Sequence, residues 1–200
     1  MMPDPWPPTC SLKGERVALI PLEMSHCSAL QDASLDGDLH SLWYTTVPSP
    51  ENMETEINRR LALREIGSMF PFTILDVKTN KPVGMTTYMN IDATHKRVEI
   101  GSTWMAKSTQ RTGMNTECKL LALTHAFEGL DCIAVEFRTH FMNRQSRTAI
   151  ERLGAKLDGI LRSHMVMANG TLRDTAVYSI IAPEWPAVKV NLQHMLQPKI

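Results

Sequence analysis

One stretch, residues 98–137, limits the choice of fold more than any other part of this 200-residue chain. Alternating apolar residues predict a strand over Val98–Met105, and Ala106–Thr112 is typical of a loop. Apolar residues at helical spacing then predict a long helix over Gly113–Leu130. The alternation resumes over Ile133–Phe137 and predicts a second strand. A strand, a helix and a strand in this order form one crossover unit in the middle of the fold.

The flanking sequence predicts further strands and helices around this crossover. Strand patterns run over Arg16–Leu22, Phe70–Val77, Pro82–Ile91, Ile160–Met167 and Thr175–Ile181. Helical patterns run over Ser25–Leu35, Pro50–Gly67, Asn143–Leu153 and Glu184–Leu196. The Asn169-Gly170 pair predicts a type I′ turn between the last two strands, because both residues tolerate a positive φ. This order of elements is that of an α+β fold.

Length and composition favour a single globular domain. A flexible, proline-rich leader over residues 1–11 is expected to precede one domain over residues 12–200. With 43% hydrophobic and 21% charged residues, the chain can bury a core of its own. The 21 basic and 21 acidic residues cancel, which argues against nucleic-acid binding and against attachment to an acidic membrane.

The sequence also lacks the usual marks of membrane insertion, export and metal binding. No apolar run approaches the roughly 20 residues of a membrane span, and the first residues do not form a secretory signal. A cytoplasmic location is therefore expected. The four cysteines and seven histidines show no metal-ligand spacing, so no metal site is expected and the cysteines are interpreted as reduced thiols.

The loop Gln110–Thr116 stands at the predicted start of the long helix. The first N–H groups of a helix have no partners within it, and together with the helix dipole they attract anions. Gly113 lets the backbone approach a phosphate, and Arg111 and two threonines offer charge and hydroxyl donors. Glu117 in the first turn is expected to repel such a group. As a bare pattern, a glycine before a helix is more often only part of a turn.

The same loop resembles the signature of a known enzyme family. Gln110-x-x-Gly113-x-Asn115 follows a strand with Glu99-Ile100-Gly101 and precedes a long helix. This arrangement resembles the Gln/Arg-x-x-Gly-x-Gly/Ala motif of the GNAT N-acetyltransferases, with Asn115 in place of Gly or Ala. The resemblance implies the GNAT fold, in which helices flank a central mixed and mostly antiparallel sheet.

A second segment resembles the ribosomal-protein, RimJ/RimL-type branch of this family. Asn143-x-x-Ser146, followed by Ile150-Glu151-Arg152-Leu153-Gly154, is similar to the N-x-x-S and LG elements of that branch. The ending, from Arg162 through Glu184-Trp185-Pro186, is similar to it as well. The resemblance extends from about residue 12 to residue 196, nearly the whole chain.

The resemblance implies acetyl-CoA as cosubstrate, a primary amine as acceptor and direct transfer between them, without a metal. The expected contacts to the CoA pyrophosphate come from the loop residues Gln110, Arg111, Thr112, Gly113, Met114, Asn115 and Thr116. In the family, the two central strands diverge and admit the pantetheine arm. A bulge at Gly101–Trp104 is expected to free backbone groups, so that an N–H of Thr103, Trp104 or Met105 polarises the thioester carbonyl. The Trp104 side chain itself is expected in the core.

Two residues are candidates for the proton transfers that amide formation needs. Glu99 precedes Gln110 by the spacing of the general-base glutamate in histone-acetylating members, although a strand glutamate is more often a solvated or paired charge. Ser146 is the candidate to hydrogen-bond the leaving thiolate, because Ile150 stands where many members have a tyrosine acid. Asn143 suits a helix N-cap, and the resemblance implies that it also contacts the pantetheine arm.

Other roles stay open on the sequence alone. Tyr178 is a second acid candidate, although a residue in an alternating strand is more often part of the core. Asn115 and Ile150 depart from the commoner pattern, so a non-catalytic acyl-CoA-binding or sensor module on the same fold is the alternative to an enzyme. A nucleic-acid-associated domain finds no basic patch to support it. The amine acceptor, a small molecule or a protein N-terminus, is not identified: ribosomal-protein N-termini, polyamines, amino acids, aminoglycosides and xenobiotic amines all stay open. Analogy with such folds allows a homodimer.

Overall fold

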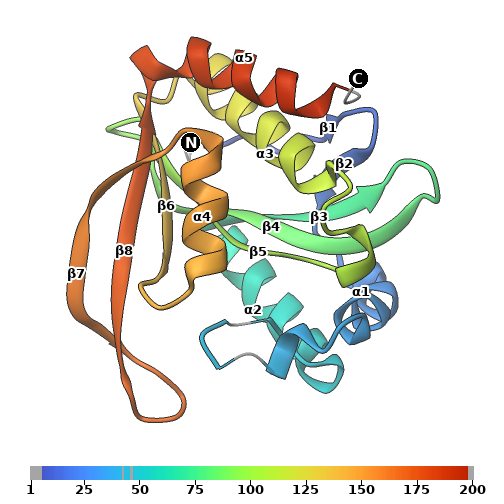
Figure 1. Cartoon of the computed structure of the whole chain (residues 1–200). Coiled ribbons are helices and arrows are strands. Elements are labelled where there is room, and N and C mark those ends of the chain that lie inside the picture. Colours follow the sequence, from blue (N-terminus) through green and yellow to red (C-terminus); the bar gives the residue numbers. More distant parts are fainter. Residues whose placement is uncertain (1–5, 42, 46, 198–200) are drawn as a thin grey trace.

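The computed structural model describes residues 6–41, 43–45 and 47–197. Its centre is an eight-stranded sheet in the order β1-β2-β3-β4-β5-β6-β8-β7 (Figure 1). The strands are β1 (Leu12–Lys13), β2 (Val17–Pro21), β3 (Met69–Asp76), β4 (Lys81–Asp92), β5 (Arg97–Met105), β6 (Ala134–His140), β7 (Lys156–Val166) and β8 (Leu172–Ile181). Neighbouring strands are antiparallel except β5 and β6, which are parallel. The predicted α+β class and the central crossover are therefore confirmed.

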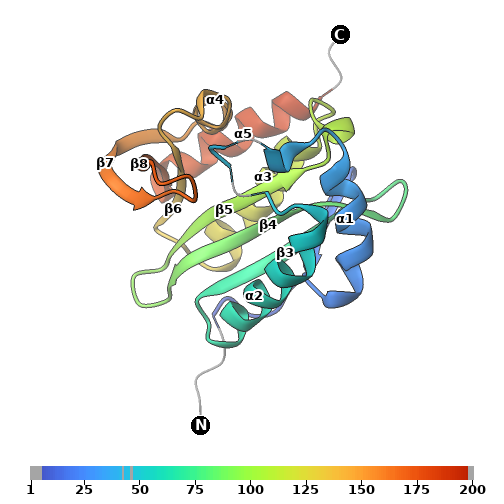
Figure 2. The same ribbon diagram turned by 90° about the horizontal axis from the view of Figure 1, so that it is seen from below.

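Helices cover both faces of this sheet. The α-helices of the described residues are α1 (Cys27–Leu35), α2 (Met53–Glu65), α3 (Met114–Thr124), α4 (Arg144–Leu153) and α5 (Trp185–Leu196). Short 3-10 helices span Met24–His26, Leu39–Ser41, Pro50–Asn52, Lys107–Thr109 and Ala182–Glu184, and a π-helical turn, His125–Gly129, continues α3. α1 and α2 lie on one face, and α3 and α5 lie on the other, with α4 beside β6 (Figures 1 and 2).

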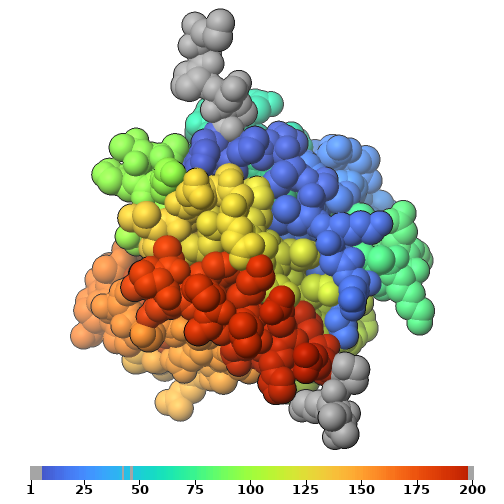
Figure 3. Space-filling model, turned by 90° about the horizontal axis from the view of Figure 1, so that it is seen from above, coloured from blue at the N-terminus to red at the C-terminus, as the bar shows by residue number. Residues whose placement is uncertain are grey.

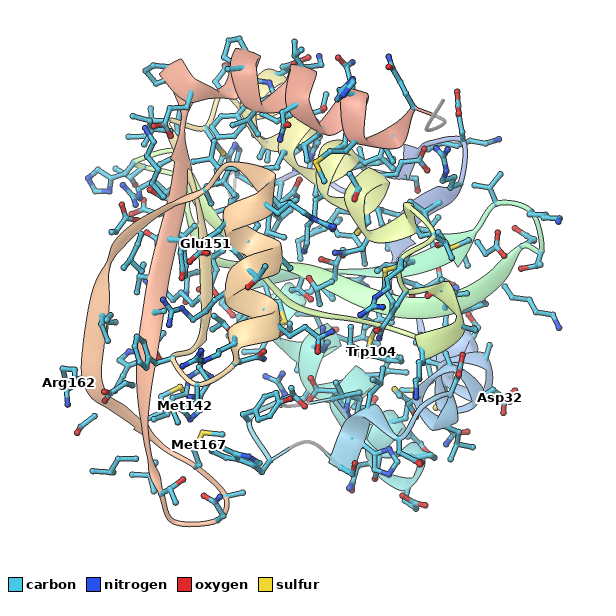
Figure 4. The ribbon with its side chains drawn as sticks, in the orientation of Figure 1. Asp32, Trp104, Met142, Glu151, Arg162 and Met167 are labelled. Carbon is cyan, nitrogen blue, oxygen red and sulfur yellow. The ribbon has the colours of Figure 1, made fainter. Side chains whose placement is uncertain are left out.

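Two separate apolar cores form, one on each face of the sheet. The larger core joins the sheet to α3, α4 and α5 and includes Tyr88, Ile100 and Phe137. The smaller core joins the sheet to α1 and α2 and includes Met85 and Trp104. Because β3 is covered on both sides, all of its first six residues are buried, which explains its continuous apolar run. Trp104 is 5% exposed and lies between β5 and the lower helices (Figure 4), which confirms the core position expected for its side chain.

The two parallel strands pair over a short length only. Arg97–Glu99 of β5 pair with Ala134–Glu136 of β6, and beyond this point the strands no longer pair. β5 carries a bulge after the point of divergence, because Met85 and Thr87 of β4 pair with Trp104 and Gly101, which leaves one additional residue on β5. The predicted divergence and bulge are therefore both present.

Three local predictions need correction or extension. Asn169 is not among the residues with positive φ, so the turn is not of type I′; Gly170 alone has φ +79°. Gly170 N–H donates to Met167 O, and Met167 N–H donates to Thr171 O, which is the pattern of a three-residue hairpin loop with a left-handed glycine. Ile133 lies outside β6 and is 54% exposed. Both strands of the last hairpin are longer than predicted, and β1 had no clear sequence pattern.

The first strands and the last helix lie side by side on the molecule. Figure 3 shows the blue N-terminal strands beside the yellow α3 and the red α5. Arg16 Nη2 donates to Leu196 O at 3.2 Å, which joins these segments. Of the predicted leader, residues 1–5 lie outside the described residues, whereas Trp6 and Cys10 contact the larger core. No helix in the described part of the chain is long and apolar enough to cross a membrane.

Glu117 connects the start of α3 to the first strands. Its side chain is buried, and its carboxylate accepts the backbone N–H groups of Glu15 (3.2 Å), Arg16 (2.7 Å) and Val17 (2.7 Å). The Arg16 guanidinium lies 3.7 Å from the same carboxylate. The side chain therefore points into the protein, which corrects the expectation that it would repel an anion at the helix start.

Glu117→Ala should lower the free energy of unfolding by about 2–3 kcal/mol, because it leaves buried N–H groups without an acceptor. Urea denaturation followed by circular dichroism measures the change. Glu15→Ala is the matched control, since the Glu15 side chain is 90% exposed. Equal effects of the two substitutions would show that the Glu117 contacts do not hold the first strands.

Candidate functional site

The divergence of β5 and β6 opens the sheet between two helix starts. β5 leads through the loop 106–113 to the start of α3, and β6 leads through residues 141–143 to the start of α4 (Figure 1). The sequence-predicted residues of the loop, of β5 and of α4 therefore lie around the point where the two strands separate, which is called the opening below. Because helix N-termini carry partial positive charge, this arrangement favours an anionic, extended ligand.

The loop before α3 has the backbone geometry of an anion site. Gly113 is the N-cap of α3 with φ +90°, and Arg111 also has a positive φ, of +62°. Glu117 N–H donates to Gly113 O, but among the described residues the N–H groups of Asn115 and Thr116 have no partner. The helix start is thus open to an external acceptor, as the sequence predicts.

The polar side chains of this loop mostly stabilise the loop itself. Gln110 Nε2 donates to Met105 O at 3.3 Å, which ties the loop to the end of β5. Thr112 Oγ1 donates to Thr109 O at 2.5 Å and lies 3.5 Å from Met114 N. The Thr116 side chain is buried. The groups of this loop that its own contacts leave available are therefore backbone N–H groups and the Arg111 side chain.

The start of α4 places Ser146 at the opening. Asn143 is the N-cap, and its Oδ1 accepts the Ser146 N–H at 2.9 Å, which confirms the predicted cap. The Ser146 hydroxyl has no hydrogen-bond partner among the described residues and lies in a half-buried position.

Tyr178 fixes α4 against β8 instead of facing the opening. Its hydroxyl donates to Glu151 Oε1 at 2.8 Å and accepts from Arg147 Nε at 2.9 Å. Figure 4 shows Glu151 between α4 and β8. Burial raises the pKa of Tyr178 above its usual value. The tyrosine is therefore engaged in holding the helix, in agreement with the core position given as its alternative.

Glu99 reaches the opening from the opposite face of the sheet. Val98 and Ile100 point into the larger core under α3, so Glu99 between them points toward the α1 and α2 side. Its side chain is only 6% exposed, and it lines a cavity of about 200 Å³ together with Arg138 and Asn90. Glu99 and Ser146 thus approach the divergence from different faces.

One oxygen of the Glu99 carboxylate is engaged, and the other has no hydrogen-bond partner among the residues that the structure describes. Oε2 accepts from Asn90 Nδ2 at 2.7 Å and lies 3.5 Å from Arg138 Nε. Oε1 lies beside Gly101, where a side-chain Cβ would approach it to 2.9 Å. Burial raises the pKa of Glu99 above its usual value, while Arg138 and Asn90 oppose this rise. A carboxylate with a raised pKa is a stronger proton acceptor than an ordinary glutamate.

Two buried cations hold the β5 bulge, one from each face of the sheet. On the α2 side, Arg60 is 1% exposed, and its guanidinium donates to Glu56 (2.7 Å), to Thr87 Oγ1 (2.8 Å) and to Ser102 O (3.5 Å). Ser102 has a φ of +47°, a backbone conformation that side-chain-bearing residues rarely adopt. The contact to Ser102 O therefore supports a strained point of the bulge.

On the α3 side, Lys119 is 7% exposed, and its Nζ donates to Thr103 Oγ1 at 2.6 Å. No carboxylate of the described residues pairs with it, and burial lowers the pKa of Lys119. The sequence pattern predicts neither the burial of these two cations nor their contacts to the bulge. Arg60 had a signal, since Glu56 stands four residues before it on the same helix. Nothing in the pattern around Lys119 distinguishes it from a solvated lysine.

Comparison with known proteins shows the family to which the chain belongs. Residues 16–156 match the model of the acetyltransferase (GNAT) domain. Because this match spans more than half of the chain, the protein belongs to the GNAT acetyltransferase family, and acetyl transfer is its chemistry. A search of the curated proteins finds no match.

Solved structures agree with this assignment. A GCN5-related N-acetyltransferase from Brucella melitensis is 30% identical, with a TM-score of 0.87 over 99% of this chain and 90% of that one. Mycobacterium smegmatis RimJ in complex with CoA-disulfide is 22% identical, with a TM-score of 0.78 over 94% and 95% of the two chains. The Salmonella typhimurium acetyl transferase that modifies the N-terminal serine of ribosomal protein L7/L12 is 20% identical, with a TM-score of 0.75 over 86% and 99%. The last two share the fold.

Lys119→Met should raise the free energy of unfolding by about 1 kcal/mol or more at neutral pH, because it removes a buried charge that has no carboxylate partner. The pKa of Lys119 is lower in the folded chain, so its charge opposes folding in full below the folded pKa. The gain in the free energy of unfolding should therefore shrink as the pH rises toward 10.5, the ordinary pKa of a lysine. Urea denaturation at several pH values measures this, with Lys13→Met as the exposed control. A variant less stable than the parent protein at neutral pH would contradict the analysis.

Proposed function

We propose that this protein transfers the acetyl group of acetyl-CoA directly to a primary amine. The observation that carries the proposal is the opening between β5 and β6. One end of it has the unpartnered N–H groups of the α3 start, and one face of it has the buried Glu99 carboxylate with a free oxygen. A donor with a pyrophosphate, an extended arm and a thioester fits the first feature, and an amine fits the second.

The acetyl-CoA side of the site is assigned to the loop, to β5 and to α4. The pyrophosphate would lie on the N–H groups of residues 111–116, next to Gly113. Asn143 and the unpaired part of β5 would hold the pantetheine arm. An N–H group of Thr103, Trp104 or Met105, in or beside the bulge, would polarise the thioester carbonyl. Mycobacterium smegmatis RimJ, a protein of the same fold, is solved in complex with CoA-disulfide, which supports a CoA thioester as the donor.

The proton transfers are assigned to Glu99 and Ser146. The amine arrives protonated, and Glu99 accepts its proton through Oε1, directly or through a water. The amine nitrogen then forms a bond to the thioester carbon, and the carbon–sulfur bond breaks. The Ser146 hydroxyl donates a hydrogen bond to the leaving thiolate, which acquires the proton released by the new amide. Glu99 and Ser146 act from opposite faces, so neither blocks the other.

The branch of the family is a finer proposal. The Asn143 and Ser146 pattern and the shared fold with RimJ favour a RimJ/RimL-type enzyme, with a cytoplasmic location. The non-catalytic sensor has less support. The Asn143 cap holds Ser146 in place, and the Ser146 hydroxyl and one Glu99 oxygen have no partner among the described residues, which leaves both groups available for proton transfer.

The first experiment titrates the purified chain with acetyl-CoA by calorimetry and then follows thiol release with a panel of amines. Binding together with amine-dependent thiol release is expected. Ser146→Ala should keep the acetyl-CoA affinity and lose most of the turnover, because the thiolate loses its donor. Binding without release from any amine would favour the sensor. Absence of binding would overturn the assignment of the loop.

Glu99→Gln should lower kcat/KM for the amine by about 100-fold or more, the usual contribution of a general base. In the parent protein, kcat/KM should fall as the pH drops through the Glu99 pKa, which burial raises above its usual value. The variant should lose this acid limb and keep only the dependence from the ionisation of the amine itself. Asp92→Asn is the control, since Asp92 lines the same cavity but bonds His95. An unchanged pH profile in Glu99→Gln would exclude Glu99 as the base.

A further inference from the structure

Beyond Glu99, the same face of the sheet carries a buried histidine with an unsatisfied nitrogen. His140 ends β6, pairs with Thr175 of β8 and is 5% exposed. Its Nδ1 accepts the Met142 N–H at 3.1 Å, so in the neutral ring the hydrogen resides on Nε2. Nε2 is buried and has no partner in the described chain. His140 therefore presents a hydrogen-bond donor that the protein itself does not satisfy.

Arg173 brings a second set of free donors to the same place. It lies two residues before Thr175 on β8, hence on the same face, and its Nε donates to Thr175 Oγ1 at 3.0 Å. The residue is half-buried, and no carboxylate in the described ranges forms an ion pair with it. The neighbouring Asp174 accepts instead from Arg162 Nε at 2.6 Å and from Ser163 N–H at 2.7 Å.

These donors lie close enough to Glu99 for their charges to interact. Arg173 lowers the pKa of Glu99. Burial first, and then the charge of Arg173, lower the pKa of His140, which favours the neutral ring. Arg173 interacts with Glu99 only at longer range and forms no ion pair with it. A half-buried guanidinium in this state attracts an oxyanion, and a carboxylate matches its fork of N–H groups. The Trp43 ring, 5.2 Å from the His140 ring and nearly perpendicular to it, borders the donors on one side.

We propose that the acceptor is an amino acid, whose amine is presented to Glu99 and whose carboxylate is bound by Arg173 and His140. This inference rests on the proposed acetyl transfer and specifies its substrate class. A protein N-terminus, which the RimJ/RimL resemblance suggests as acceptor, has no α-carboxylate for Arg173, so the inference favours a free amino acid over it. Carboxylate and ammonium then each meet the opposite charge on one face of the sheet. A polyamine or an aminoglycoside offers nothing to satisfy Arg173, and its additional ammonium groups would be repelled by it.

The test compares amines that differ only in the carboxylate. Thiol release from acetyl-CoA is measured with glycine and glycinamide and with alanine and ethylamine. The spacing between amine and carboxylate is then varied with 3-aminopropanoic acid and 4-aminobutanoic acid, each compared with its alkylamine counterpart. Each acid should have a kcat/KM at least about 10-fold above its carboxylate-free partner at the best spacing. That spacing reports the distance between the two halves of the site.

Variants then assign the preference to the two donors. Arg173→Met should lower kcat/KM for the amino acid by about 30-fold or more, as expected when one partner of a desolvated charge pair is removed. The carboxylate-free amines should change by less than about 3-fold, and Arg173→Lys should restore part of the loss. His140→Phe keeps a ring and removes the donor, and it should reduce the preference for the acid by roughly 5- to 10-fold. Arg162→Met is the matched control, because Arg162 points outward from β7 (Figure 4).

The outcomes distinguish a failure of the amino-acid inference from a failure of the proposed acetyl transfer. Thiol release that is equal for acids and amides, or that is not reduced selectively in Arg173→Met, overturns the amino-acid inference and leaves acetyl transfer intact. Absence of acetyl-CoA binding overturns the proposed function itself. If acetyl-CoA binds but no amine reacts, calorimetry of the CoA-bound protein with each amino acid decides. Binding that is lost in Arg173→Met supports the inference, and absence of binding overturns it.

Discussion

The short pairing of β5 with β6 is the constraint on which the rest of the site depends. The strands share hydrogen bonds only from Arg97–Glu99 to Ala134–Glu136. Beyond that point, each strand has backbone groups that need other partners. On β5, the Gln110 side chain donates to Met105 O and the Arg60 guanidinium donates to Ser102 O within the bulge, so these two carbonyls are satisfied. What remains unsatisfied is the part of the backbone that a ligand can reach.

Local patterns in the sequence were sufficient for the parts of the site that local chemistry determines. Gly113 and Asn143 were readable because a left-handed residue and a side-chain acceptor are what these helix starts require. The hairpin turn at Asn169-Gly170 was misread because the loop closes over three residues, which a two-residue signal does not reveal. Gly101 indicated the bulge, but not that its missing side chain leaves room for the Glu99 carboxylate.

The roles of the remaining residues could not be predicted from the sequence, because they depend on contacts with residues far away in the chain. Lys119 and Arg60 have the sequence context of solvated helix charges, and only the sheet that covers them makes them buried. His140 and Arg173 are far apart in the chain and become neighbours through the pairing of β6 with β8. Placing these two on the face of Glu99, with Ser146 on the other, separates acceptor recognition from cosubstrate binding. Substitutions on one face can therefore change the acceptor while the cosubstrate side stays as it is.

The Glu117 carboxylate joins segments that are about 100 residues apart in the chain. Residues 15–17 cannot separate from α3 without exposing the Glu117 carboxylate. The first strands and the start of α3 therefore unfold locally as one cooperative unit. Hydrogen exchange in this unit should therefore be linked: whatever is bound at the loop before α3 would also slow exchange of the amides of Arg16 and Val17. The exchange rates of the Arg16 and Val17 amides would therefore report whether the site is occupied.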